Sequence, residues 1–198
     1  MANDSVIQLS TGRILVPICR RDRREERYSA FCFYSDDGGR SWRKSKNEIE
    51  LPRAGAMDPH LVELKGGKVL MTVRNQLGRV YQAISQDRGN IWTNIDSTDL
   101  QTPDSPIAIK RIPQTEDLLM VWNNSREKRR PLTSATSNDE GENWVNFKDI
   151  ETSEDYTCSH PSITFIDENA LLIYNIYDEK NKWVSLKLKK LPIKWFYP

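Results

Sequence analysis

Three short stretches of the sequence combine a carboxylate with a tryptophan, residue types that together can bind a sugar. They read SDDGGRSW at 35–42, SQDRGNIW at 85–92 and SNDEGENW at 137–144. A carboxylate accepts hydrogen bonds from hydroxyl groups, and an indole offers a flat apolar platform. All three fit S-x-D-x-G-x-x-W, and their serines lie 50 (85 − 35) and 52 (137 − 85) positions apart. Such repetition predicts a repeat architecture before it predicts an active site.

The same octet also suits a tight turn. Its aspartate can accept hydrogen bonds from nearby backbone amides, and its glycine adopts a backbone conformation that other residues resist. Its tryptophan can pack an apolar face between neighbouring sheets. Because one active site does not need three copies of one acid, we expect the octets to be structural. The positions concerned are Ser35, Asp37, Gly39, Trp42, Ser85, Asp87, Gly89, Trp92, Ser137, Asp139, Gly141 and Trp144.

The elements around the octets are short and rich in Val, Ile, Leu, Phe and Tyr, which is typical of strands. The second octet, for example, is preceded by HLVELKGGKVLMTVR, a short NQLG turn and RVYQAIS. No helical periodicity is evident. A unit of four antiparallel strands in about 50 residues describes a propeller blade. The sequence therefore predicts an all-β propeller with four blades at roughly 4–47, 57–100, 104–151 and 158–198, the last without an octet.

Composition narrows the class of protein. The chain has 198 residues, 37% hydrophobic and 29% charged, with a formal net charge of +1. It is therefore predicted to be globular, and we expect neither nucleic acid nor a membrane as its partner. Three cysteines without CxxC spacing and two isolated histidines favour neither a disulfide framework nor a zinc site, and we expect no metal or cofactor. The opening MANDSVIQLS has no signal-peptide pattern, so the compartment stays open, and a longer protein could be exported.

The octet is identified as the Asp box, and the chain resembles the sialidase (neuraminidase) superfamily of BNR-repeat proteins over nearly its whole length. The resemblance rests on GRILVPICR, AMDPHLVELKGGKVLMTVRNQLGRVYQAISQDRGNIW, RIPQTEDLLMVWNN, RRPLTSATSNDEGENW and LKLKKLPIKWFY. It implies a six-bladed propeller, of which this chain would supply about four blades as a C-terminal part. It also implies an acidic glycan or sialoside as partner.

The resemblance further implies a particular chemistry. Three arginines would hold the substrate carboxylate, since a guanidinium can grip a carboxylate through two parallel bonds. A tyrosine paired with a glutamate would act as nucleophile, and an aspartate as acid/base. Arg74, in TVRNQ, matches the second arginine. Arg130, before PLTSATS, is the candidate for the third, with Arg129 as the alternative register. Each can also be read as a solvated arginine of a charged loop.

The resemblance departs from the family pattern at the catalytic positions. Asp58 stands where the family has its glutamate, 16 residues before Arg74, and His160 in CSHPSITF stands where the tyrosine is expected. Tyr156, four residues earlier, is a candidate for a displaced nucleophile. The imidazole of His160 can act as an acid/base near neutral pH or serve as a hydrogen-bonded structural group. Asp58 can equally cap a turn, and His60 is expected to be structural.

Two functions remain as alternatives. The first is a sialidase-like glycoside hydrolase of the exo-alpha-sialidase type, acting on sialic acid or a related acidic sugar. The second is a non-catalytic or degenerate carbohydrate-binding propeller, suggested by Asp58, His160 and the missing blades. Four blades cannot close a six-bladed ring, so the open blade edges also predict self-association.

Overall fold

The chain folds into four antiparallel β-sheets in a computed structural model that describes residues 5–198, apart from the side chain of Asn94. It divides into two compact units, Met1–Asp99 and Leu100–Pro198. No helix among the described residues is long and apolar enough to span a membrane. The only helices in residues 5–198 are two 3-10 turns, η1 (Lys65–Gly67) and η2 (Ile193–Phe196).

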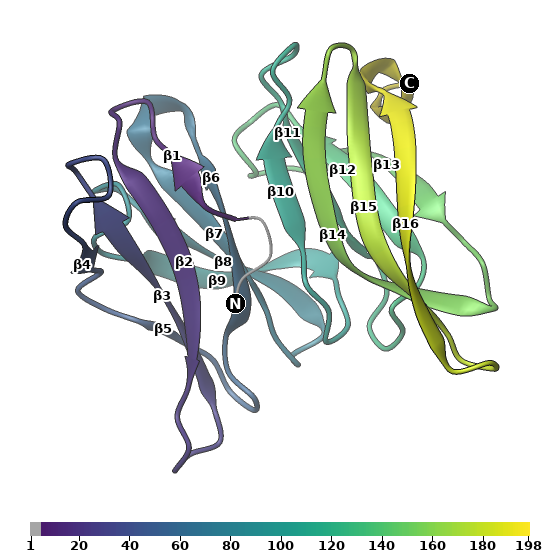
Figure 1. Cartoon of the computed structure of the whole chain (residues 1–198), viewed down its shortest axis with the longest axis horizontal. Helices are drawn as coiled ribbons and strands as arrows, with labels where there is room; N and C mark the ends of the chain where they lie inside the picture. Colours follow the sequence, from purple (N-terminus) through teal and green to yellow (C-terminus); the bar gives the residue numbers. More distant parts are fainter. Residues whose placement is uncertain (1–4) are drawn as a thin grey trace. The chain divides into compact units, whose positions relative to one another are not determined.

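The first unit carries two sheets, drawn from purple to blue-green in Figure 1. The first sheet runs in the order β1-β2-β3-β4, and β5 also pairs with β3. The second runs in the order β6-β7-β8-β9. Their strands are β1 (Ile7–Gln8), β2 (Ile14–Arg21), β3 (Tyr28–Ser35), β4 (Arg43–Lys44), β5 (Ile49–Glu50), β6 (Met57–Glu63), β7 (Val69–Arg74), β8 (Arg79–Ser85) and β9 (Thr93–Gln101).

The second unit carries the other two sheets, drawn from teal through green to yellow in Figure 1. One runs β10-β11-β12-β13, and the last runs β14-β15-β16 with three strands. Their strands are β10 (Ala108–Arg111), β11 (Leu118–Asn123), β12 (Leu132–Ser137), β13 (Val145–Glu151), β14 (Tyr156–Ile166), β15 (Asn169–Asp178) and β16 (Trp183–Pro192). Apart from β5, which pairs with β3, strands consecutive in sequence within a sheet are neighbours in space, which is the up-and-down order of a propeller blade.

Each unit buries its own core between its two sheets. In the first unit Leu15 of β2, Met71 of β7 and Trp92 belong to one buried cluster. In the second unit Leu119 of β11, Tyr174 of β15 and Phe196 of η2 belong to another. Strand β11, LLMVWN, is buried at all six positions, as expected of a central strand covered on both faces.

The three octets form the turns between the third and fourth strands of the first three sheets. In the third octet Asp139 accepts hydrogen bonds from the Ser137 hydroxyl (2.8 Å) and from the backbone and side-chain nitrogens of Asn143 (2.9 and 2.8 Å). The serine hydroxyl in turn accepts the amide of Gly141 (2.9 Å). The other two octets repeat this pattern around Asp37 and Asp87. All three carboxylates are thus engaged by their own turns.

The tryptophans of the octets differ in burial. Trp92 is almost fully buried and its backbone is bracketed by Asn47, which donates to its carbonyl (2.8 Å) and accepts from its amide (2.9 Å). Trp42 is 44% exposed and donates its indole N–H to the carbonyl of Gly39 within its own octet. The second octet is therefore packed into the core of the first unit, while the first lies at its surface.

Candidate functional site

Asp58 and Arg74 form an ion pair in the second sheet. Asp58 is the second residue of β6 and Arg74 is the last of β7, and the register of the two strands places Met57 opposite Arg74. The Asp58 Oδ2 atom lies 3.1 Å from the Arg74 Nη1 atom, which donates a hydrogen bond to it. Both side chains are mostly buried, with 17% and 19% exposed. The ion pair therefore fixes where the guanidinium can point.

The backbone at Asp58 is strained. Its φ of 40° lies in the left-handed region that non-glycine residues seldom occupy. The register of β6 against β7 shifts between Met57 and His60, so a bulge interrupts the ladder here, and Pro59 comes next in the chain. A bulge redirects the side chain it carries, and strain of this kind gathers at functional sites. His60, just beyond the bulge, is buried in the sheet.

His160 occupies the corresponding place in the last sheet. Its φ is 54°, the register of β14 against β15 shifts between Ser159 and Ser162, and Pro161 is the next residue. Its Nδ1 atom lies 3.0 Å from the hydroxyl of Ser159. Asp58 and His160 thus share one local design, a bulge in the first strand of a blade with a left-handed residue before a proline.

Arg129 and Arg130 precede β12 and use their guanidinium groups differently. Arg129 donates from Nε (3.0 Å) and Nη2 (2.8 Å) to the carbonyl of Asp104, and its own carbonyl accepts the amide of Cys158 (2.8 Å). Arg130 donates from Nη1 to the carbonyl of Glu154 (2.5 Å). Arg129 therefore links the segment before β10 to β14, through its guanidinium at Asp104 and its backbone carbonyl at Cys158.

Tyr156 lies in a polar network centred on Glu151. Its hydroxyl donates to Glu151 (2.7 Å) and accepts from Lys187 (3.1 Å). The other oxygen of Glu151 accepts from the hydroxyl of Tyr174 (2.6 Å) and lies 2.8 Å from Lys187 and 3.2 Å from Lys189. Burial raises the pKa of Tyr156, and its hydrogen bond to Glu151 raises it further. The hydroxyl is thus held protonated as a donor.

Glu151 itself stays ionised. Burial alone would raise the pKa of its carboxyl, but the hydrogen bonds from Lys187, Tyr156 and Tyr174 more than offset burial and lower the pKa to about 2. The sequence did not single out this residue. Glu151 opens the acidic run ETSED, and no pattern separates it from its neighbours. Of its partners, the sequence pointed only to Tyr156.

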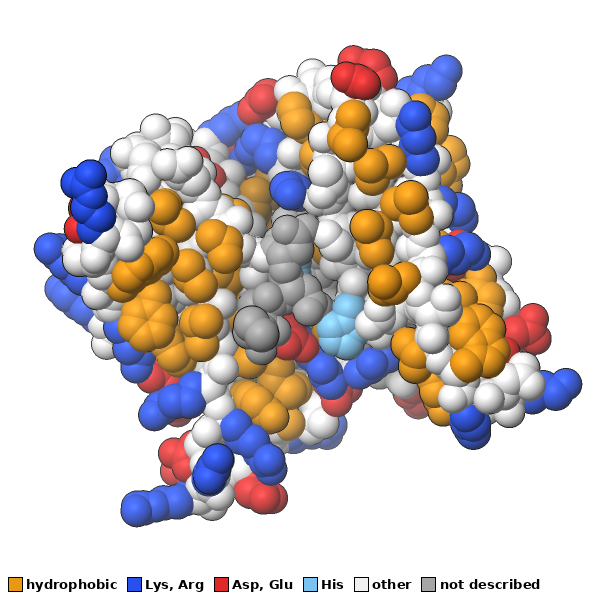
Figure 2. Space-filling model, viewed as in Figure 1, with side chains coloured by type: hydrophobic (Ala, Val, Ile, Leu, Met, Phe, Trp, Pro, Cys, Tyr) orange, Lys and Arg blue, Asp and Glu red, His pale blue; other side chains and the backbone are white. Residues whose placement is uncertain are grey.

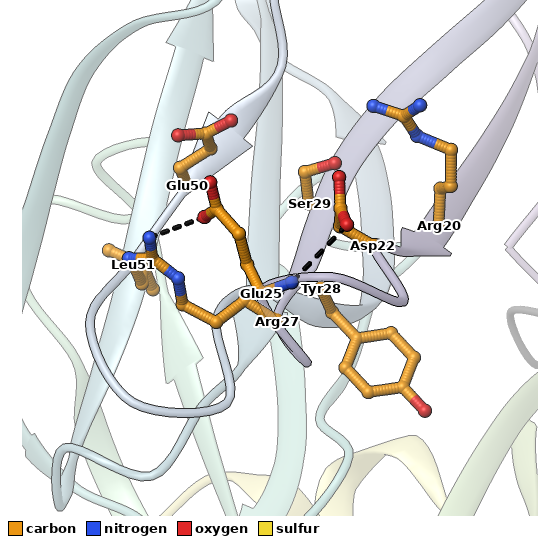
Figure 3. Close-up of a pocket in the computed structure, with 8 residues that line it drawn as sticks. All are labelled: Arg20, Asp22, Glu25, Arg27, Tyr28, Ser29, Glu50 and Leu51. Atoms are coloured by element: carbon orange, nitrogen blue, oxygen red, sulfur yellow. Dashed lines mark hydrogen bonds and ion pairs between the residues drawn. The ribbon is translucent and has the colours of Figure 1, made fainter.

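A small pocket in the first unit has none of these residues in its lining (Figure 3). Both acidic and basic side chains line it. Arg27 donates a hydrogen bond to the Glu25 carboxylate, and the Asp22 carboxylate accepts one from the backbone amide of Glu25. A volume of about 110 Å³ is below the usual range for ligand pockets. The residues lining it are Arg20, Asp22, Glu25, Arg27, Tyr28, Ser29, Glu50 and Leu51. Among residues 5–198, no group of three or more His, Cys, Asp or Glu side chains is arranged to hold a metal ion.

Antiparallel meanders of three to five strands, three of them with an Asp-box turn between the third and fourth strands, are those of a β-propeller of the sialidase type. A family model described as "BNR repeat-like domain" matches residues 1–173, so the chain belongs to this family. An alignment 96 residues long with human Sialidase-4 is 35% identical, and it covers 42% of this chain and 19% of that protein.

Solved structures share the fold. The NanB sialidase of Streptococcus pneumoniae (K499G mutant) matches 96% of this chain with a TM-score of 0.79 and 20% identity, over 30% of its own length. A leech intramolecular trans-sialidase, solved with 2,7-anhydro-Neu5Ac, matches 96% with a TM-score of 0.80 and 19% identity, over 31% of its length. A protein of unknown function from Dyadobacter fermentans matches 96% with a TM-score of 0.79 and 21% identity, over 53% of its length. The chain thus spans about half or less of the relatives it matches.

Proposed function

We propose that this chain forms part of a site for sialic acid or a related acidic sugar, and that the protein is a sialidase-type glycoside hydrolase. The observation that carries the proposal is the Asp58–Arg74 ion pair at a strained bulge. A guanidinium is a planar fork of N–H donors suited to a carboxylate, and an ion pair through one nitrogen sets the plane of the others. Asp58 would act as the positioning residue for Arg74, which would bind the sugar carboxylate.

His160 would supply acid/base chemistry from the corresponding bulge. An imidazole changes charge near neutral pH, and the contact of its Nδ1 atom with Ser159 restrains the ring. Arg130, in the second unit, is proposed separately as a contact for an acidic group.

One observation favours a second candidate function, a glycan-binding propeller without turnover. The hydroxyl of Tyr156 is already engaged by Glu151 and Lys187, and its pKa is raised. A nucleophilic phenol must lose its proton, so this environment disfavours Tyr156 as a nucleophile. Binding through Arg74 is common to both candidates.

The binding test compares sialic acid with its methyl ester, which lacks the carboxylate charge. The unmodified chain should bind the acid more tightly than the ester, because a charge-assisted hydrogen bond is about twice as strong as a neutral one. Arg74→Lys, which keeps the charge but not the planar fork, should lower affinity for the acid roughly tenfold and leave affinity for the ester nearly unchanged. Asp58→Asn should weaken binding less, since asparagine tolerates positive φ and removes only the ion pair.

Arg20→Lys is the matched control, because Arg20 also lies near the end of a second strand but bonds Glu48 at the surface. Equal affinity for acid and ester in the unmodified chain would contradict the site. Turnover is decided separately with a fluorogenic sialoside. Release that is lost in His160→Gln supports hydrolysis, whereas binding without release supports the second candidate.

A further inference from the structure

Arg53 lies at the same end of the second sheet as the Asp58–Arg74 ion pair. It stands shortly before Met57, the first residue of β6, and its Nη1 atom donates a hydrogen bond to the carbonyl of Gln76 (2.6 Å). Gln76 is the second residue after Arg74, so the Cα atoms of these two residues are at most about 7 Å apart. The turn before β6 and the turn after β7 therefore meet beside the candidate site.

The turn that carries Arg53 is held in place by the first sheet. The amide of Tyr28, the first residue of β3, donates to the carbonyl of Ala54 (2.8 Å), and the amide of Ala56 donates to the carbonyl of Tyr28 (2.9 Å). Gly55 lies between them, and a Cβ atom added there would lie 2.0 Å from the Tyr28 carbonyl oxygen. These two bonds and the close approach at Gly55 fix the backbone on which Arg53 stands.

The carbonyl that accepts from Arg53 is fixed as well. Asn75, which precedes Gln76, is fully buried. Its side chain accepts the amide of Leu77 (2.8 Å) and donates to the carbonyl of Arg79 (3.0 Å). The turn after β7 is thus closed from within, so the bond from Arg53 joins two rigid segments.

The backbone at Arg53 is strained in the same way as at Asp58. Arg53 has a φ of 59° and Asp58 a φ of 40°, and both values lie in the left-handed region that non-glycine residues seldom occupy. Strain of this kind gathers at functional sites. Two such residues at one end of one sheet mark Arg53 as part of the same site.

The charge of Arg53 has no acidic partner within residues 5–198. Its guanidinium is exposed, and its one hydrogen bond in this part of the chain is to the uncharged carbonyl of Gln76. The basic side chains of the β2–β3 hairpin differ, since they lie among acidic ones in Figure 2. Arg20, Arg21 and Arg27 each form an ion pair there. Arg53 therefore leaves a positive charge available at this end of the first unit.

The two arginines offer contacts to different parts of a ligand. Arg74 is 19% exposed, ends a strand and is balanced by Asp58, whereas Arg53 is exposed on a turn outside the strand ladder. A guanidinium has five N–H donors in one rigid plane. The bond to Gln76 uses one of these donors in Arg53 and restrains the plane, so less side-chain entropy is lost when the others bind an anion.

We propose that Arg53 binds a second acidic group of the ligand, carried by the sugar next to the one whose carboxylate Arg74 holds. The inference rests on the function proposed above. A sulfate ester is such a group, because its oxygens, like those of a phosphate, can accept two parallel N–H donors of one guanidinium. Arg53 is then a specificity-determining residue that selects doubly acidic glycans.

The test compares two ligands that differ only in this group: sialyllactose and the same trisaccharide with a sulfate ester on its galactose. Both are used as thioglycosides, which resist hydrolysis, so titration calorimetry measures binding alone. The unmodified chain should bind the sulfated ligand about threefold more tightly at low salt, a modest gain because Arg53 is exposed. Equal affinity for the two ligands would overturn the proposal.

Arg53→Gln should abolish this gain and leave the affinity for sialyllactose nearly unchanged, because glutamine can still donate to the Gln76 carbonyl but carries no charge. Arg43→Gln is the matched control. Arg43 is an exposed arginine of β4 in the same unit, so its substitution changes the net charge equally and should preserve the gain. A gain that survives Arg53→Gln, or that Arg43→Gln removes, would refute the contact.

A purely structural role for Arg53 predicts another result, in which Arg53→Gln lowers the affinity for both ligands by the same factor. That outcome would also refute the proposal. Failure of the proposed function looks different, because the unmodified chain would then bind sialic acid and its methyl ester equally. A preference for the acid over the ester, without any gain from the sulfate, would refute the role of Arg53 alone.

Discussion

The carboxylate of Glu151 connects several strands of the second unit. It is the last residue of β13, and it binds side chains from β14, β15 and β16. Its own side chain is 8% exposed, so its charge is tolerated only because four donors surround it. Tyr156 is one of those donors, which gives it a structural task beside any catalytic one.

The pH dependence of stability should reveal this network. The pKa of Glu151 is about 2 in the folded chain and about 4.3 for an ordinary glutamate, so the native state prefers the ionised form. The stabilisation is therefore present above about pH 4.3 and is lost as pH falls through about 2. We expect about 2 kcal/mol of the free energy of unfolding to disappear across this window, a figure reduced because Lys187 and Lys189 are partly solvated.

Urea denaturation at a series of pH values measures the loss, and Glu151→Gln should flatten this part of the curve. Glu154→Gln, three residues along in an exposed position, is the control and should behave like the unmodified chain. A Glu151→Gln variant with the same acid dependence as the unmodified chain would show that another carboxyl is responsible.

Individual site residues were predictable only where a motif marked them. Arg74 and Asp58 were both singled out from their places in TVRNQ and AMDPH. Their direct ion pair, however, results from the bulge in β6, which shifts the register of β6 against β7, and the position of a bulge cannot be read from the sequence. Glu151 was missed because its partners come from three strands up to 38 residues away. Such a network depends on tertiary packing, which local patterns do not encode.

At the scale of single elements, the octet turns are set by glycine. Gly89 has a φ of +88°, and a Cβ atom added there would lie 2.8 Å from Leu15 Cδ2. Leu15 is fully buried in the core of the first unit, so its side chain would have to shift within that core to make room. Gly39, at the same place in the first octet, has a φ of +91° and would meet only the Trp42 ring at 3.6 Å.

Alanine at these two positions separates backbone strain from packing. Gly39→Ala should cost about 1–2 kcal/mol of unfolding free energy, from the left-handed backbone alone. Gly89→Ala should cost about 1–3 kcal/mol more, because the methyl group also overpacks the core. Thermal or urea unfolding of both variants checks the difference. An equal loss of unfolding free energy in the two variants would mean that the Leu15 side chain moves aside for the added methyl group.

The strands themselves were open to prediction from the sequence. Runs such as GGKVLMTVR show little alternation of apolar and polar residues, but turn residues bound them. The regular spacing of the octets then shows where each strand falls within its repeat. The missing strand beside β16 was harder to foresee. WVSLKLKK reads as an ordinary strand, and whether it lies at an edge depends on which strands pack beside it in the folded chain.

At the scale of the whole molecule, charge should govern self-association. The chain is nearly neutral, with a net charge of +1, but β16 carries Lys187, Lys189 and Lys190, and Lys182 precedes it. Self-association along this edge would bring the lysines of two copies together. It should therefore strengthen several-fold from low salt to about 0.5 M salt, as screening weakens this repulsion.

Sedimentation in a series of NaCl concentrations measures this effect, and Lys190→Gln should reduce it. Weaker association at higher salt would point to attraction between opposite charges, which β16 does not contain.

The paired bulges of β6 and β14 carry a consequence for how this protein can be altered. One backbone shape, left-handed before a proline, accepts an acid in one blade and an imidazole in another. The bulge is thus a position at which the titratable side chain can differ between blades while the backbone geometry stays the same. Reactivity in such a protein can diverge by single substitutions that leave the surrounding strands unchanged.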